Sequence, residues 1–79
     1  MHENYAPYEI KLAREIASTL DDLDSIALHL AYVRKYQEEF LRKVLAKVMS
    51  IPEDQIKKTR AALYVFLIRQ SERHGAARH

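Results

Sequence analysis

Residues 61–68 read Ala61-Ala62-Leu63-Tyr64-Val65-Phe66-Leu67-Ile68, and this run of eight apolar side chains decides the fold class. No glycine or proline interrupts the run, and its flanks are rich in Lys, Arg, Gln and Glu, which favour helices. The run is far shorter than the roughly 20 apolar residues that a helix needs to span a bilayer. It therefore predicts a helix that is buried by protein and does not cross a membrane.

The apolar side chains of this run cover every side of a helix, which leaves two interpretations open. The helix lies either in the core of its own chain or against a second chain, because a domain of this size has little surface with which to surround a helix. We favour the core and keep a dimer through the last helix as the alternative. The candidate interface residues for that dimer are Tyr64, Phe66 and Ile68.

The rest of the chain also has the composition of a helical domain. Its 79 residues are 48% hydrophobic and 30% charged, which fits one domain over residues 1–79. One glycine, two prolines and no cysteine argue against a sheet and exclude a disulfide framework. We predict an all-α fold, a small bundle of three or four helices, in a cytoplasmic protein. Its ordered core is expected over about residues 7–73, with frayed ends.

The spacing of apolar residues predicts where the other helices lie. The first runs from about Pro7 to Leu20, and the second runs from about Leu23 to Tyr36. The apolar stripe then shifts in phase, so we expect a break near Gln37 before a third helix begins. The side chains expected to bury one face of the second helix are Leu23, Ile26, Ala27, Leu30 and Val33.

Two polar segments are expected to cap helices. The carboxylates of Asp21, Asp22 and Asp24 can accept hydrogen bonds from the free N–H groups of the second helix. Residues 50–53, Ser-Ile-Pro-Glu, match the capping box, so a helix is expected to begin there. Residues 51–73 then form either one helix or two, the second starting with Thr59 as its N-cap.

Charge is distributed unevenly along the chain. Residues 1–39 carry four Lys or Arg against eight Asp or Glu, a net charge of −4. Residues 40–79 carry nine against three, a net charge of +6. The basic half suits an anionic partner such as nucleic acid. Alternatively, acidic and basic helices face each other within the fold or across a dimer.

Residues 42–61, Arg-Lys-Val-Leu-Ala-Lys-Val-Met-Ser-Ile-Pro-Glu-Asp-Gln-Ile-Lys-Lys-Thr-Arg-Ala, resemble the bihelical core of helix-turn-helix DNA-binding proteins. Ala46 matches the small residue that lets the second helix cross closely, and Ile56 matches an inward anchor of that helix. The resemblance implies that residues 52–60 enter the major groove. It implies base contacts by Gln55 and Lys58 and phosphate contacts by Lys43, Lys47, Lys57 and Arg60.

A second resemblance concerns residues 57–68, a basic segment followed by an aromatic and apolar one. This segment is similar to one near the C-terminal end of small helical replication-associated or uncharacterised proteins of mobile elements. The resemblance adds to the expectation of a nucleic-acid context.

The sequence contains no residue pattern that is typical of a metal site or of a catalytic site. His2, His74 and His79 lie near the ends of the chain, and His29 stands alone in the second helix, where we expect it at the helix surface or at its boundary with the core. We therefore predict no metal site, cofactor, catalytic residue or small-molecule substrate. The best functional hypothesis is a helix-turn-helix-like DNA-binding module; the alternative is a protein-interaction or assembly domain without a nucleic-acid role.

Overall fold

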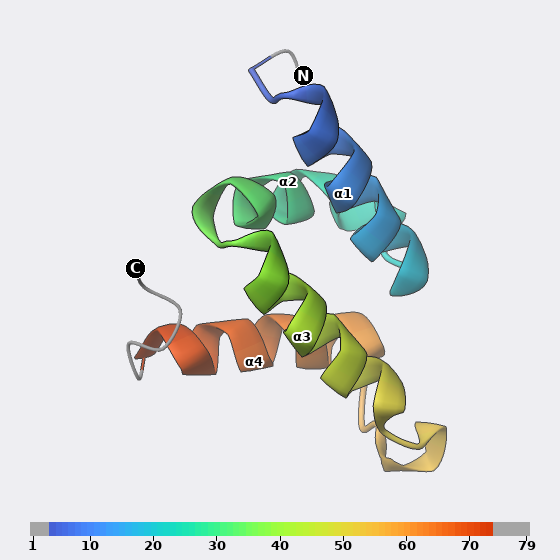
Figure 1. The fold of residues 1–79 in the computed structure, drawn as a ribbon. Helices are drawn as coiled ribbons and strands as arrows, with labels where there is room; N and C mark the ends of the chain where they lie inside the picture. Colours follow the sequence, from blue (N-terminus) through green and yellow to red (C-terminus); the bar gives the residue numbers. More distant parts are fainter. Residues whose placement is uncertain (1–3, 74–79) are drawn as a thin grey trace. The chain divides into compact units, whose positions relative to one another are not determined.

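The computed structural model describes residues 4–73, and within them it holds four α-helices and no strand (Figure 1). The helices are α1 (Pro7–Thr19), α2 (Ile26–Lys35), α3 (Glu38–Ser50) and α4 (Arg60–Arg73). Single 3-10 turns at Leu23–Ser25 and Glu53–Gln55 precede α2 and α4. The predicted all-α class with three or four helices is thus confirmed. The frayed ends predicted for the chain lie outside the described residues.

The helices form two units, the first ending at Gln37 and the second starting at Glu38. In the first unit α1 packs against α2, and in the second α3 packs against α4. Tyr36 takes an extended backbone conformation, which ends α2 and confirms the break predicted near Gln37. Each unit is therefore a pair of helices joined by an irregular connection. A single domain over residues 1–79 stays a prediction.

The core of the first unit follows the predicted stripe of α1 and only part of that of α2. The buried side chains of α1 and its C-cap include Leu12, Ala13, Ile16, Ala17 and Leu20. On α2, Leu30 and Val33 are buried as predicted, whereas Ala27 and Leu23 are exposed. The prediction for Leu23 is wrong because this residue lies in a 3-10 turn, whose three residues per turn put it out of phase with α2.

The connection between α1 and α2 also differs from the predicted capping. Asp21 has a φ of 56°, and its N–H and that of Asp22 bond to the Ser18 and Ala17 carbonyls. This pattern ends a helix with a left-handed residue, a position that glycine usually takes. Neither the 3-10 turn nor α2 has a side-chain cap, so the prediction that the aspartates cap α2 is wrong.

The carboxylate of Asp22 instead contacts a histidine. Its Oδ2 lies 2.9 Å from Nε2 of His29, and the imidazole is almost completely buried. The predicted surface or boundary position of His29 is therefore wrong. A buried polar side chain needs a hydrogen-bond partner, and this one is seven positions earlier in the chain, across a turn that periodicity does not describe. The contact joins the connection to α2.

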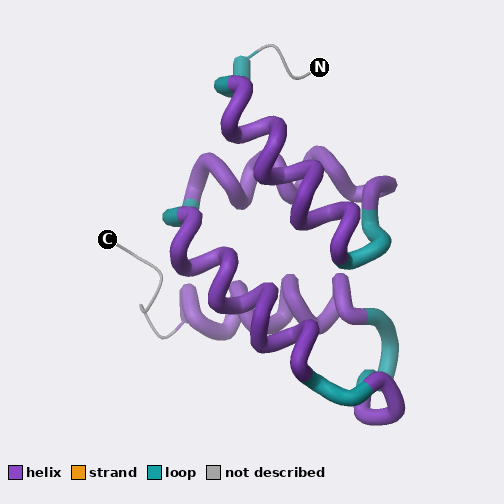
Figure 2. Tube along the Cα trace, turned by 45° about the vertical axis from the view of Figure 1, so that its right-hand side comes forward, coloured by secondary structure: helices purple, strands orange, loops and turns teal. Residues whose placement is uncertain are grey.

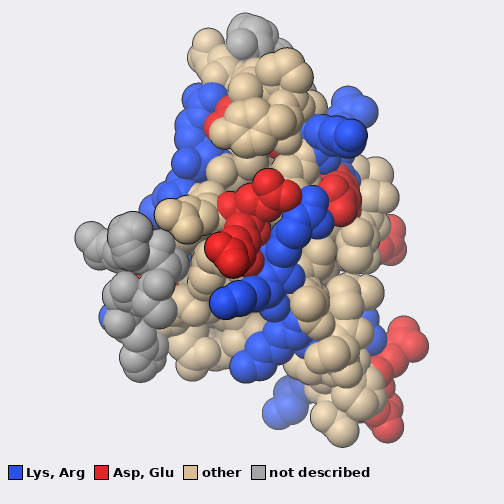
Figure 3. All heavy atoms as spheres, in the orientation of Figure 1, with Lys and Arg blue, Asp and Glu red and all other residues tan. Residues whose placement is uncertain are grey.

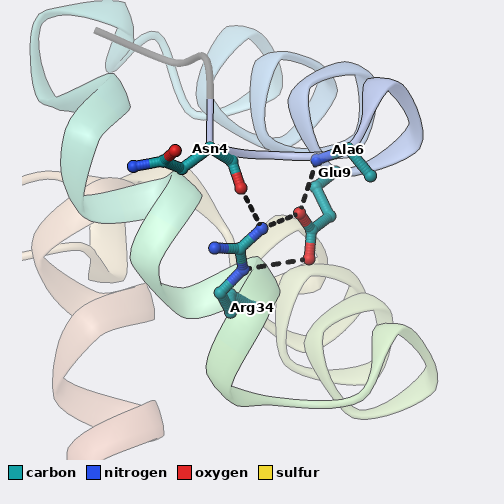
Figure 4. A network of polar contacts seen from close by, with 4 residues as sticks. All are labelled: Asn4, Ala6, Glu9 and Arg34. Carbon is teal, nitrogen blue, oxygen red and sulfur yellow. Dashed lines mark hydrogen bonds and ion pairs between the residues drawn. The ribbon is translucent and has the colours of Figure 1, made fainter.

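Arg34 of α2 links the start of α1 to the second helix (Figure 4). Its Nη2 donates to Glu9 Oε1 at 2.7 Å and to the Asn4 carbonyl at 2.6 Å. Glu9 Oε1 also accepts the Ala6 N–H at 2.8 Å, which satisfies a free donor at the start of α1. The guanidinium lies 4.3 Å from the centre of the Tyr5 ring. One carboxylate thus caps α1 and anchors it to α2.

The hydrogen bond from Arg34, followed by that from the Ala6 N–H, holds the pKa of Glu9 below its ordinary value. Glu9 therefore binds a proton less readily in the folded chain than in the unfolded chain. Its stabilising effect is fully present above the pKa of the unfolded carboxyl group. That effect is lost as the pH falls through the lower pKa of the folded state.

We expect Glu9→Gln to reduce the acid sensitivity of the first unit, because glutamine has no proton to gain. Between about pH 5 and pH 2, the free energy of unfolding should fall further for the wild-type chain than for this variant. Urea unfolding followed by far-ultraviolet circular dichroism at several pH values measures the difference. Arg34→Gln should remove the same part of the pH dependence. Parallel curves for the wild type and both variants would contradict the assignment.

Candidate functional site

The chain between α3 and α4 does not form the helix that was predicted from Pro52 to about Arg60. Pro52 has an extended backbone, with a φ of −57° and a ψ of 144°, and only the 3-10 turn Glu53–Gln55 follows it (Figure 2). Ser50 is the last residue of α3, and its hydroxyl donates to the Lys47 carbonyl at 2.8 Å. The predicted capping box is therefore wrong. A proline disfavours helix in the residue before it, which explains the break.

Helix α4 begins after Thr59, as in the second of the two alternatives for residues 51–73. The Thr59 hydroxyl oxygen accepts the Ala62 N–H at 3.0 Å and so caps the helix. Arg60, one residue later, donates from Nη1 to the Val48 carbonyl at 2.6 Å. The same carbonyl also accepts the Ile51 N–H at 3.3 Å, so the Arg60 bond ties the start of α4 to the last turn of α3. The guanidinium of Arg60 thus has a backbone partner, and its contact with phosphate stays a prediction.

The other residues predicted to contact nucleic acid are exposed but do not form a reading helix. Lys43 and Lys47 lie one turn apart on α3, and Gln55, Lys57 and Lys58 lie in the connection. Figure 3 shows Lys and Arg side chains over α3 on the face in view. Ala46 is exposed, so α4 does not cross α3 there as the helix-turn-helix resemblance implies. The structure brings these lysines to the surface in two places, α3 and the connection.

Two of the three residues predicted to form a dimer interface belong to the core. Tyr64 and Ile68 are completely buried, and they lie on one face of α4 because they are four residues apart. They offer no surface to a second chain, so the favoured core interpretation holds for them, and the dimer alternative keeps only the third residue. Phe66 lies on another side of α4, where 54% of its surface is exposed. Among the described residues of α4, Phe66 is the one large hydrophobic side chain that is exposed.

Phe66 lies in a pocket of about 440 Å³ that the second unit forms from its own residues. One wall comes from the first two turns of α4, where positions three and four apart line up along one side of the helix. The other wall is the extended chain that leads into α4. The apolar residues that line the pocket are Ile56, Ala62, Leu63 and Phe66. The basic residues that line it are Lys57 and Lys58.

The pocket combines an apolar floor with positive charge. Among the described residues that line it, two are lysines and none is acidic. Its volume falls within the range of pockets that bind small ligands or side chains. Sequence reasoning missed this pocket because it assigned Ile56 to the inside of a helix pair. Ile56 has an extended backbone directly after the 3-10 turn, and it lines the pocket together with residues of α4.

Comparison with known proteins leaves the pocket as the main guide to function. No protein family model, curated protein or solved structure matches the chain. Within residues 4–73, no group of three His, Asp or Glu side chains is placed to hold a metal ion. His2, His74 and His79 lie outside that range. In the same part of the chain, every helix is too short or too polar to cross a membrane.

We expect Thr59→Ala to lower the free energy of unfolding by about 1 kcal/mol, because the first turn of α4 loses its side-chain cap. Urea unfolding at neutral pH measures the change. Thr19→Ala is a matched control, since the Thr19 hydroxyl only donates to the Glu15 carbonyl within α1. That variant should stay within about 0.5 kcal/mol of the wild type. An equal effect of both substitutions would contradict the capping role of Thr59.

Proposed function

We propose that the second unit is a protein-interaction module that takes an apolar side chain flanked by carboxylates into the pocket beside Phe66. The exposure of Phe66 in a pocket with two lysines on its lining carries this proposal. This is the protein-interaction alternative drawn from the sequence, and the residues that line the pocket are its proposed site. The missing helix at residues 52–60 favours it over DNA reading.

The apolar floor supplies the attraction for a partner. Covering an exposed phenylalanine or leucine side chain is worth about 1.5–3 kcal/mol, because apolar surface leaves water. Aromatic side chains are enriched at the centres of protein interfaces, with charged groups at their rims. Phe66 and Leu63 supply such a centre, and Lys57 and Lys58 supply such a rim.

The lysines determine which apolar segment is favoured. An ion pair at an exposed rim adds little to affinity, typically less than about 1 kcal/mol. It does raise the rate of encounter with an oppositely charged partner and disfavours a partner of like charge. A partner with Asp or Glu on both sides of its apolar side chain therefore fits Lys57 and Lys58 best.

Random peptides displayed on phage and selected on the full chain test the proposal. We expect enrichment of peptides with Leu, Ile or Phe next to Asp or Glu. These peptides should bind Phe66→Ser at least about tenfold more weakly, which corresponds to a loss of about 1.4 kcal/mol. Synthetic peptides and fluorescence anisotropy measure the affinities.

Met49→Ser is the control for this selection, because Met49 is also an exposed apolar residue of the second unit but does not line the pocket. Its peptide affinity should equal that of the wild type. Circular dichroism verifies that both variants fold. Selected peptides that bind Phe66→Ser as tightly as the wild type would refute the proposal.

A second candidate function is association with the phosphate backbone of nucleic acid. The exposed lysines of α3 and of the connection favour it, and Figure 3 shows Lys and Arg side chains over α3, next to acidic ones. Because no helix forms at residues 52–60, this association is sequence-independent and relies on phosphate contacts. Lys43 and Lys47 are its main contacts, one turn apart on the exposed side of α3.

Binding to random duplex DNA across a salt series tests this second candidate. Replacing Lys43 and Lys47 together by alanine should reduce the slope of log affinity against log salt by about two. Lys11→Ala with Arg14→Ala is the charge-matched control on α1, where both side chains are exposed. If the wild-type chain fails to bind at low salt, or the control pair has the same effect, the candidate is rejected.

A further inference from the structure

Leu23 is an exposed apolar side chain held in a well-defined turn. It starts the 3-10 turn Leu23–Ser25, and 56% of its surface is exposed. Two features define the backbone of this turn. Asp21 ends α1 in a left-handed conformation, and the carboxylate of Asp22 contacts the buried His29. The leucine is therefore presented by a fixed backbone rather than by a loose loop. A partner that binds it loses little conformational entropy.

Carboxylates flank Leu23 on both sides. Asp21 and Asp24 are exposed, whereas Asp22 is engaged with His29. An apolar side chain between two available carboxylates is the counterpart of a pocket with an apolar floor and two lysines. The charges of the two chain halves, −4 for residues 1–39 and +6 for residues 40–79, add a longer-range attraction between copies.

Neighbouring carboxylates distinguish Leu23 from the other large apolar side chains that are exposed in the described residues. These side chains are Tyr8, Leu23, Met49 and Phe66. Tyr8 has a proline before it, and Met49 lies in α3 between Val48 and Ser50, two residues after Lys47. Only Leu23 among them has aspartates at the preceding and following positions. Charge complementarity therefore selects Leu23 as the side chain that the pocket accepts.

We propose that the pocket beside Phe66 binds a second copy of this chain, with Leu23 of that copy on the apolar floor and its Asp21 and Asp24 at Lys57 and Lys58. This inference rests on the proposed function and names its partner. The contact is between unlike surfaces, so each copy offers one turn and one pocket. A variant that has lost the leucine can therefore still bind through its pocket, and a variant that has lost the pocket can still bind through its leucine.

Sedimentation equilibrium of the full chain at low salt tests the inference through complementation. The contact is small, so we expect association at chain concentrations of about 1 mM and weaker association as salt rises. Leu23→Ser and Phe66→Ser should each associate at least tenfold more weakly than the wild type. Their equimolar mixture should form one-to-one complexes, because Leu23→Ser keeps the pocket and Phe66→Ser keeps the leucine.

Charge reversal gives an independent test. Lys57→Glu with Lys58→Glu, and Asp21→Lys with Asp24→Lys, should each abolish self-association. Mixing these two double variants should restore it, since each then faces the opposite charge. Tyr8→Ser is the control for loss of an exposed apolar side chain, and it should associate as the wild type does. Thermal unfolding checks that every variant folds.

A wild-type chain that stays monomeric throughout this range would overturn the inference. Unchanged association of Leu23→Ser or Phe66→Ser would do the same. The peptide selection separates this failure from failure of the proposed function. Acidic apolar peptides that need Phe66, bound by a monomeric chain, would remove the second copy as partner and leave the interaction module in place. Failure of both experiments would reject the module itself.

Discussion

The backbone break at Pro52 is the constraint on which the second unit depends. Because the residue before a proline avoids the helical conformation, α3 ends at Ser50 and the chain continues extended into a single 3-10 turn. Thr59 then restarts a helix, and the bond from Arg60 to the Val48 carbonyl holds the start of α4 beside the end of α3. Phe66 lines a pocket because the irregular chain of residues 55–59 runs beside α4.

The first unit uses polar contacts in a similar way. Glu9 with Arg34 joins the start of α1 to the end of α2, and Asp22 with His29 joins the other end of α1 to α2. Between them lies a core made largely of Leu, Ile, Val and Ala side chains. A small unit has little apolar surface to bury, so polar contacts at both ends help to define how its two helices lie. They also give the turn at Leu23 a defined shape.

Several features could be predicted from residue patterns because they depend on neighbours in the sequence. The stripe of α1, the break near Gln37 and the cap at Thr59 all follow from local spacing and local hydrogen bonding. The choice for Tyr64 and Ile68 between the favoured core and the alternative dimer interface could not be made in this way. An apolar run such as residues 61–68 shows that a helix has several apolar sides, but it does not show which side its own chain covers. Phe66 was named only as a candidate interface residue, and neither its exposure nor the pocket around it was predicted.

The sequence by itself determined the helical class, most helix boundaries and the separation of acidic and basic halves, because these depend on side-chain type and on spacing over a few residues. Only the tertiary structure decided which apolar side chains remain outside. Burial is a property of the packed chain: Leu23 is left exposed by a 3-10 turn, and Phe66 by the side of α4 that α3 does not cover. The pocket likewise exists only where an extended segment and a helix meet.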